Sequence, residues 1–257
     1  MVAAGRFGDL ARMARQAAFA LPALLLAAAC EPQSQAGSKD AATQRTSGIA
    51  EPANKAAARE TSAFPQGKGF DFWVLSLSWS PGYCASEGER ANADQCEARP
   101  AYGFLVHGLW PQFERGYPRE CPTRHSRDVP RQITRANSDL FPSAGLARHQ
   151  WRAHGTCSGL SQEEYFAATR HAFAAITIPP EFRALKQRRD VSPDAVEAAF
   201  IAANPGLKAE GLAVTCDRRF LRDVRICMTR DTFEFRACRE VDANDCRLKS
   251  VTAPPAR

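Results

Sequence analysis

Three histidines in two short segments are the residues with the clearest capacity for chemistry. FLVHGLWPQ at 104–112 contains His107, and HQWRAHGTC at 149–157 contains His149 and His154. An imidazole has an unperturbed pKa of about 6.5, so near neutral pH one ring can accept a proton while another donates one. Histidines that converge from separate elements therefore suit concerted acid–base catalysis.

The spacing of His149 and His154 does not favour a metal site. It is one residue longer than the i, i+4 histidine pair of zinc proteases, which turns the second ring about 140° around a helix from the first. Gln150 follows His149 where such a protease has Glu, and the nine cysteines include no CxxC pair. We expect no metal ion and no cofactor.

The surroundings of the histidines favour a nucleic acid as the substrate. A basic cleft with exposed aromatic rings can hold a phosphate between two histidines and stack a base beside it. RNA carries its own nucleophile, the 2′-hydroxyl, so its cleavage requires neither a metal ion nor a serine or cysteine. The formal net charge of +6 permits binding to RNA but does not demonstrate it. These residues favour cleavage of phosphodiester bonds in RNA.

The same segments also carry a resemblance to a known family. HGLWPQ at 107–112 and HQWRAHGTC at 149–157 resemble the two active-site segments of the ribonuclease T2 family, and FWVLSLSWSPGYC at 72–84 is similar to its opening strand and first cysteine. The resemblance runs from about 70 to 246. It implies metal-independent cleavage of single-stranded RNA through a 2′,3′-cyclic phosphate to 3′-phosphate ends. Low base specificity and a preference for acidic pH are also implied.

The resemblance assigns a role to each histidine. His107 corresponds to the general acid that protonates the leaving 5′-oxygen, and His154 to the general base that takes the 2′-hydroxyl proton. His149 corresponds to a histidine that binds the phosphate. Near the family positions that sandwich a base lie Trp110 and Tyr117, with Gln112 beside them.

Two residues depart from the family pattern in the second segment. The family commonly has Glu after the first histidine and Lys before the second, where this chain has Gln150 and Ala153. On a helix, positions 150, 153 and 154 share one face, so we expect them to meet the phosphate together. Gln150 can still bind a phosphate oxygen, but Ala153 removes a cation worth a few kcal/mol in the transition state.

Arg152 is adjacent to the position of the missing cation and is a candidate substrate-binding residue. It lies about 100° around the helix from position 153, so its long side chain would have to fold back to the phosphate. We expect an enzyme that is slower than typical members of the family. A catalytically impaired RNA-binding protein on the same fold is the alternative, and a metal-dependent nuclease is a third and weaker hypothesis.

The amino terminus predicts export. Three arginines precede an uncharged run at 17–29, which is too short to span a bilayer, so residues 1–29 are interpreted as a signal peptide. Small residues before Cys30 satisfy the rule for signal cleavage and also resemble a lipobox, although Ala27 stands where Leu is usual. Two outcomes stay open: a lipoprotein attached to the membrane through lipidated Cys30, or a soluble periplasmic or secreted protein.

The remaining chain divides into three parts. Residues 30–66 are rich in Ala, Ser, Gln and Pro and have few large apolar side chains, which predicts a disordered tether. Residues 67–250 are expected to form one catalytic domain, and 251–257 a tail. No obligate protein partner is evident; RNA is the expected partner.

Hydrophobic patterns and turn residues predict an α+β fold. A mainly antiparallel sheet, flanked by helices, is expected because strands come early and late in the chain and helices in the middle. Strands are predicted at 70–79, closed by a turn at 80–82, and at 102–107, ending at Gly108, followed by a long loop at 113–135. Helices are predicted at 144–154, 161–176 and 192–203, and further strands at 212–216, 224–228 and 232–237. Trp73, Trp79 and Trp151 are expected in the core.

Setting Cys30 apart leaves eight of the nine cysteines, an even number that suits four disulfides in an oxidising compartment. The sequence alone does not choose among the possible pairings. The family resemblance implies the pairs Cys84–Cys96, Cys121–Cys157, Cys216–Cys246 and Cys227–Cys238. The second pair would connect the loop after the first histidine segment to the end of the second.

Overall fold

The computed structural model describes residues 67–183 and 185–256. The predicted signal peptide, the tether and Cys30 lie outside the described residues. Within them, no helix has both the length and the apolar character needed to cross a membrane.

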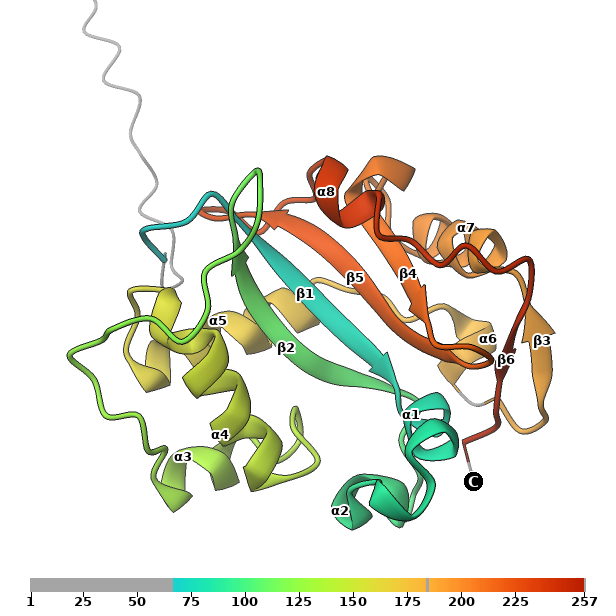
Figure 1. The fold of residues 1–257 in the computed structure, drawn as a ribbon, viewed down its shortest axis with the longest axis horizontal. Coiled ribbons are helices and arrows are strands. Elements are labelled where there is room, and N and C mark those ends of the chain that lie inside the picture. The colour runs from blue at the N-terminus through green and yellow to red at the C-terminus, as the bar shows by residue number, and fades with distance from the viewer. Residues whose placement is uncertain (1–66, 184, 257) are drawn as a thin grey trace, which may run out of the picture. The chain divides into compact units, whose positions relative to one another are not determined.

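An antiparallel four-stranded sheet in the order β2-β1-β5-β4 forms the centre of the domain (Figure 1). The strands are β1 Phe72–Trp79, β2 Phe104–Gln112, β4 Leu212–Cys216 and β5 Leu221–Thr229. A second, two-stranded antiparallel sheet pairs β3 Arg189–Val191 with β6 Val251–Ala253. The predicted α+β class with an antiparallel sheet is confirmed.

Helices occupy the connections between the strands. They are α1 Ser80–Glu87, α2 Ala93–Cys96, α3 Arg131–Ala136, α4 Ala144–Ala153, α5 Gln162–Ala174, α6 Pro180–Arg183, α7 Pro193–Ala203 and α8 Arg239–Asp242, with short 3₁₀ turns η1 Gly88–Arg90, η2 Gly155–Cys157 and η3 Ala209–Gly211. The capping box predicted for α5 is present, because the Ser161 hydroxyl accepts from Glu164 N–H and the Glu164 carboxylate accepts from Ser161 N–H. Ser143 caps α4 in the same position.

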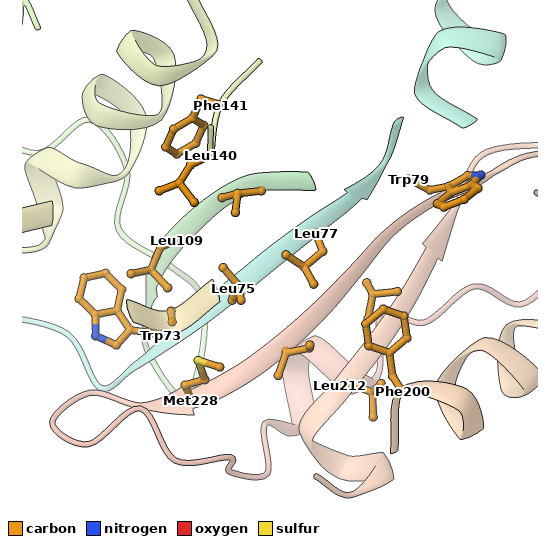
Figure 2. Packing of buried hydrophobic residues seen from close by; sticks show 14 of the residues in the cluster. Trp73, Leu75, Leu77, Trp79, Leu109, Leu140, Phe141, Phe200, Leu212 and Met228 are labelled. Carbon is orange, nitrogen blue, oxygen red and sulfur yellow. The ribbon is translucent and has the colours of Figure 1, made fainter. Parts of the chain in front are cut away.

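The main core lies on one face of the sheet. Alternate residues of β1, namely Trp73, Leu75, Leu77 and Trp79, are fully buried there (Figure 2). Side chains of α4, α5 and α7 belong to the same cluster, including Trp151, so the three tryptophans predicted as core residues are all 0% exposed. A smaller apolar cluster around Phe72 and Val74 occupies the opposite face, with Trp110 packed against it.

Several boundaries differ from those predicted. The segment expected to turn at 80–82 begins α1, because Pro81 lies in the first helical turn, where its missing N–H costs nothing. The end of the expected loop, residues 131–135, belongs to α3. Residues 232–237 are not a strand and make only an isolated bridge between Met228 and Phe235. β6 falls within the expected tail and is buried, so the domain extends past residue 250.

β2 also continues beyond Gly108, where the sequence predicted its end. Opposite β1, Ser76 pairs with Gly108 but the next residue, Leu77, pairs with Val106. His107 is therefore the extra residue of a β-bulge, which lets the strand keep its pairing while it changes which face successive side chains occupy. The chain bends at this bulge and the strand continues, instead of ending at Gly108 as expected.

All four disulfide pairs implied by the resemblance are present. Cys121–Cys157 connects the loop after β2 to η2, which directly follows α4. Cys216–Cys246 connects the end of β4 to the segment after α8.

Replacing Cys121 and Cys157 together by Ser should lower the free energy of unfolding by roughly 2–5 kcal/mol, because the unfolded chain regains the entropy of an open loop. Urea unfolding followed by circular dichroism measures this change. The matched control is the Cys216→Ser, Cys246→Ser variant, whose bridge spans 30 residues against 36. Losses of similar size are expected; an unchanged midpoint for the first variant would contradict the prediction.

Candidate active site

The candidate site lies on the face of the sheet opposite the main core. The strand register places Val74 opposite Trp110, and Ser78 opposite Asp223 of β5. Side chains alternate between the two faces of a regular strand, so His107 and Trp110, three residues apart, would point to opposite faces. The bulge instead turns the His107 side chain towards Asp223. The extra residue in β2 therefore brings the first predicted histidine to the site.

Asp223 holds His107 through a hydrogen bond of 3.2 Å between Oδ1 and Nδ1. Burial of Asp223 acts to raise its pKa, but the hydrogen bond and charge of His107, with the charges of Arg225 and Arg222, outweigh burial and hold the pKa of this carboxyl below its usual range. An ionised carboxylate only accepts hydrogen bonds, so Nδ1 of His107 carries a proton. Nε2 is left as the nitrogen that can meet a ligand.

Trp110 lies between two of the histidines. Its ring centroid is 5.2 Å from that of His107, in an edge-on arrangement, and 5.1 Å from that of His154, in a stacked one. The indole Nε1–H donates to Gln150 Oε1 at 2.8 Å, and the Arg225 guanidinium lies 5.3 Å from the ring centroid. Contacts from three elements thus fix this ring, and the ring in turn fixes the distance between the histidines.

Gly108 is required by that arrangement. A Cβ at this position would lie 2.1 Å from Gln150 Oε1 and 2.4 Å from Trp110 Nε1. Any side chain here would break the hydrogen bond between the amide and the indole.

The helical face predicted for positions 150, 153 and 154 is not formed. α4 ends at Ala153, and His154 is its C-cap with φ −128° and ψ −47°, so His154 does not continue the helix. Gln150 and Ala153 are each 1% exposed, and the Gln150 oxygen faces the indole of Trp110. Gln150 is thus placed as a support for the tryptophan, and position 153 is packed and offers no open path to a ligand.

His154 is largely enclosed and uncharged near neutral pH. Burial, followed by the charges of His149, Arg119 and His107, lowers the pKa of His154 to about 3. Its Nδ1 is buried and has no hydrogen-bond partner among the described residues. Nε2 is therefore the nitrogen of this neutral ring that can accept a proton from a ligand.

His149 is exposed and completes the histidine group. Partial burial, then the charges of Arg119, His107 and Arg152, lower the pKa of His149. Because His149 and His107 also act on the pKa of His154, the three rings lie within electrostatic reach of one another. The structure brings the three predicted histidines together.

The histidines line two cavities, with His107 and His149 in one and His154 in the other. One, of about 380 Å³, is lined by His107, His149 and Asp223 among others. The other, of about 240 Å³, is lined by His154, Arg119 and Arg225. The three residues predicted to bind a base also line it: Trp110, Gln112 and Tyr117. A larger cavity of about 780 Å³ lies between α3 and α5, and none of the predicted site residues lines it.

Asp223 and Arg119 belong to the site but were not predicted from the sequence. A charged residue between the apolar residues Leu221 and Val224 of a buried strand was a signal for Asp223. No comparable signal marked Arg119, which is one of several arginines in a polar loop. Across the described residues, no group of three or more His, Cys, Asp or Glu side chains is arranged to hold a metal ion.

Comparison with known proteins identifies the family of this chain. The family model described as the Ribonuclease T2 family matches residues 70–238. A ribonuclease of Aeromonas hydrophila is 35% identical over 184 residues, covering 66% of this chain and 76% of the relative, and Ribonuclease I of Escherichia coli is 26% identical over 204 residues, covering 63% and 76%.

The fold is also found among solved structures. An RNase-related protein from Calystegia sepium superposes with a TM-score of 0.60 at 21% identity, covering 74% of this chain and all of that one. The sequence matches and this shared fold, with the histidine segments at the centre of the matched region, show that the chain is a ribonuclease and belongs to the ribonuclease T2 family.

Proposed function

We propose that this protein is an endoribonuclease that cleaves single-stranded RNA without a metal ion, through a 2′,3′-cyclic phosphate to 3′-phosphate ends. The observation that carries the proposal is the pair of opposed histidines around Trp110: His107, protonated at Nδ1 against Asp223, and His154, held neutral by burial. In the proposed reaction His107 acts as the imidazolium, with its Nδ1–H held by Asp223 and its Nε2–H donated to the leaving oxygen, and neutral His154 accepts a proton.

The first step is an internal transfer of the phosphoryl group. Nε2 of His154 takes the proton of the 2′-hydroxyl, and the 2′-oxygen forms a bond to phosphorus. The bond from phosphorus to the 5′-oxygen breaks, and that oxygen takes the Nε2 proton of His107. The products are a 2′,3′-cyclic phosphate and a free 5′-hydroxyl, and His149 binds a phosphate oxygen throughout.

The second step hydrolyses the cyclic phosphate with the roles of the two rings exchanged. His107, now neutral at Nε2, takes a proton from water as the water oxygen bonds to phosphorus. The bond from phosphorus to the 2′-oxygen breaks, and the 2′-oxygen takes the proton from His154. Both rings return to their starting states and a 3′-phosphate remains.

Base binding is proposed for the cavity that contains Trp110, Gln112 and Tyr117. Tyr117 is 58% exposed and free to stack on a base, whereas Gln112 is nearly buried on the sheet. Stacking on aromatic rings accepts any base because every base has a π-face. Low base specificity follows from a site that relies on stacking.

We also propose that the protein acts after export, either as a lipoprotein on Cys30 or as a soluble periplasmic or secreted enzyme. The support is the uncharged apolar run at 17–29, preceded by three arginines, and the four disulfides, which form in oxidising compartments. A catalytically impaired RNA-binding protein is the second candidate, favoured by the packed Gln150 and Ala153.

Purified protein should cleave a dinucleoside phosphate in EDTA at about pH 5 to 8 and release a cyclic phosphate. His107→Ala should lower kcat about 10²- to 10⁴-fold, because the leaving oxygen loses its proton donor. Chromatography of the products measures both. RNA that binds but yields no product at any pH would favour the RNA-binding alternative, and activity lost only in EDTA would favour a metal-dependent nuclease.

The acid side of the pH profile tests the state of His154. A base with a pKa near 3 stays deprotonated above that value, so kcat/KM should hold down to about pH 4 and fall as the pH approaches 3. An acid limb near pH 6.5, with circular dichroism showing intact fold, would mean that His154 is solvated and would contradict the prediction.

Asp223→Asn keeps the size of the side chain and removes the charge that holds the protonated His107. We expect kcat to fall about 10- to 100-fold with little change in KM, because a neutral amide holds the Nδ1–H of His107 less firmly and Nε2 is then less well aimed at the leaving oxygen. A loss of stability in urea unfolding with kcat unchanged would contradict a positioning role for Asp223.

A further inference from the structure

The proposed reaction needs a cation at a place where the family pattern no longer supplies one. Charge grows on the phosphate oxygens in the transition state, and a fixed cation beside them contributes several kcal/mol of stabilisation. The family commonly places a lysine directly before the second histidine, but this chain has Ala153, which is packed at 1% exposure. The cation must therefore come from another element.

Arg119 reaches the site from the loop between β2 and α3. It lines the 240 Å³ cavity together with His154, Trp110 and Tyr117, and its side chain is 54% exposed. Arg119 thus lines the cavity that contains His154, the proposed general base, and the residues proposed to bind a nucleobase.

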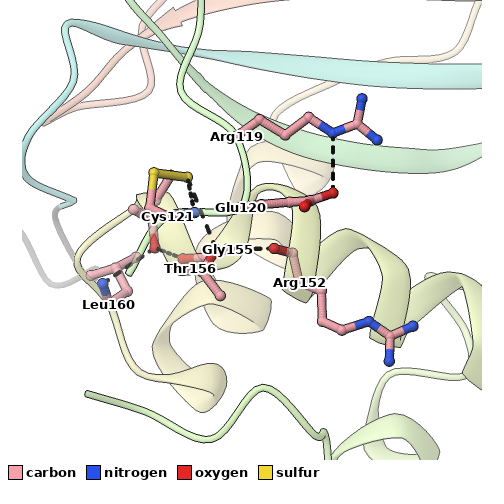
Figure 3. The surroundings of a disulfide bond; sticks show 9 residues. Arg119, Glu120, Cys121, Arg152, Gly155, Thr156 and Leu160 are labelled. Carbon is pink, nitrogen blue, oxygen red and sulfur yellow. Dashed lines mark hydrogen bonds and ion pairs between the residues drawn. A yellow bond between two sulfur atoms is a disulfide. The ribbon is translucent and has the colours of Figure 1, made fainter. Parts of the chain in front are cut away.

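The backbone fixes Arg119 directly against the position of the missing lysine. Glu120 N–H donates to the carbonyl of Ala153 at 2.9 Å, and Cys121 is joined to Cys157 by the disulfide shown in Figure 3. Glu120 adopts φ +52°, in the left-handed region, where the chain turns sharply between these two attachments. Segment 119–121 is therefore clamped to the C-terminal end of α4.

The guanidinium of Arg119 remains suited to a phosphate. Its contact with the Glu120 carboxylate is a 3.6 Å ion pair through Nε, which leaves the terminal amino groups to meet a ligand. Two parallel N–H groups match two phosphate oxygens, a geometry that Arg forms and Lys does not.

The other nearby arginines are placed differently. Arg225 lines the same cavity but lies over the ring of Trp110, and Arg222 forms ion pairs with Glu87 and Asp217. Arg152, which the sequence suggested, extends away from Arg119 (Figure 3). Its charge acts on His149, whereas the charge of Arg119 acts on both His149 and His154.

We propose that Arg119 binds the scissile phosphate and stabilises its transition-state charge, replacing from a disulfide-anchored loop the cation that the second histidine segment lacks. The proposal rests on the proposed ribonuclease mechanism. It makes Cys121–Cys157 a positioning element for a catalytic group as well as a stabilising bond.

The first test is kinetic and uses the full chain with a dinucleoside phosphate. Arg119→Ala should lower kcat about 10²- to 10³-fold and change KM much less, because the contact strengthens in the transition state. Arg119→Lys should recover part of the loss, since it keeps the charge but not the paired N–H groups. Arg115→Ala is the matched control: it removes the same charge from an exposed position of the same loop and should leave kcat unchanged.

The second test does not depend on activity. Because the charge of Arg119 lowers the pKa of His149 and of His154, Arg119→Ala should raise both pKa values in an NMR titration, and Arg115→Ala should raise neither. Urea unfolding of each variant shows that the fold is retained.

Two results would overturn the proposal. The first is that Arg119→Ala has the same kcat and the same histidine pKa values as Arg115→Ala. The second is that Arg152→Ala loses more kcat than Arg119→Ala. If the wild-type chain cleaves no RNA, the proposed function fails separately. Calorimetry with 3′-adenosine monophosphate then decides on Arg119: weaker binding by Arg119→Ala supports its phosphate contact, and equal affinity rejects it.

Discussion

The bulge at His107 is the constraint on which the rest of the site depends. Side chains alternate along a strand, so β2 could not present both Trp110 and His107 to one face in a regular pairing with β1. One extra residue corrects the parity and turns His107 towards Asp223 of β5. Because β1 is buried on both sides, the sheet cannot slip to relieve the bulge without exposing its core residues.

The two departures from the family pattern form one coupled change. A glutamate buried where Gln150 lies would need a cation to offset its desolvation, and the family commonly has a lysine nearby to provide it. This chain has a neutral amide and a methyl group instead, so the interior under Trp110 stays uncharged. Gln150 keeps one function that needs no charge, since its oxygen accepts from the indole. The positive charge then has to enter from outside the helix.

The sequence predicted the elements whose signals are local and missed those set by tertiary contacts. The capping box of α5 and the apolar runs of β1 and β4 were recognisable because each is decided by neighbouring residues. The bulge, the enclosure of Gln150 and the approach of Arg119 to α4 depend on residues far apart in the chain, and no spacing rule contains them. The histidine segments were recognisable by type and spacing, but which nitrogen faces a ligand required Asp223.

The charges around the cluster explain how a base with so low a pKa can act. In the free protein, burial and the positive groups around His154 keep its ring neutral. A bound phosphate brings a negative charge among these groups, which lowers the free energy needed to protonate the His154 ring. In the proposed reaction His154 therefore gains basicity when the substrate is present, and the charge of Arg119 is shared with phosphate oxygens instead of opposing the proton. The cations that lower the pKa of His154 in the free protein therefore also favour binding of the substrate phosphate.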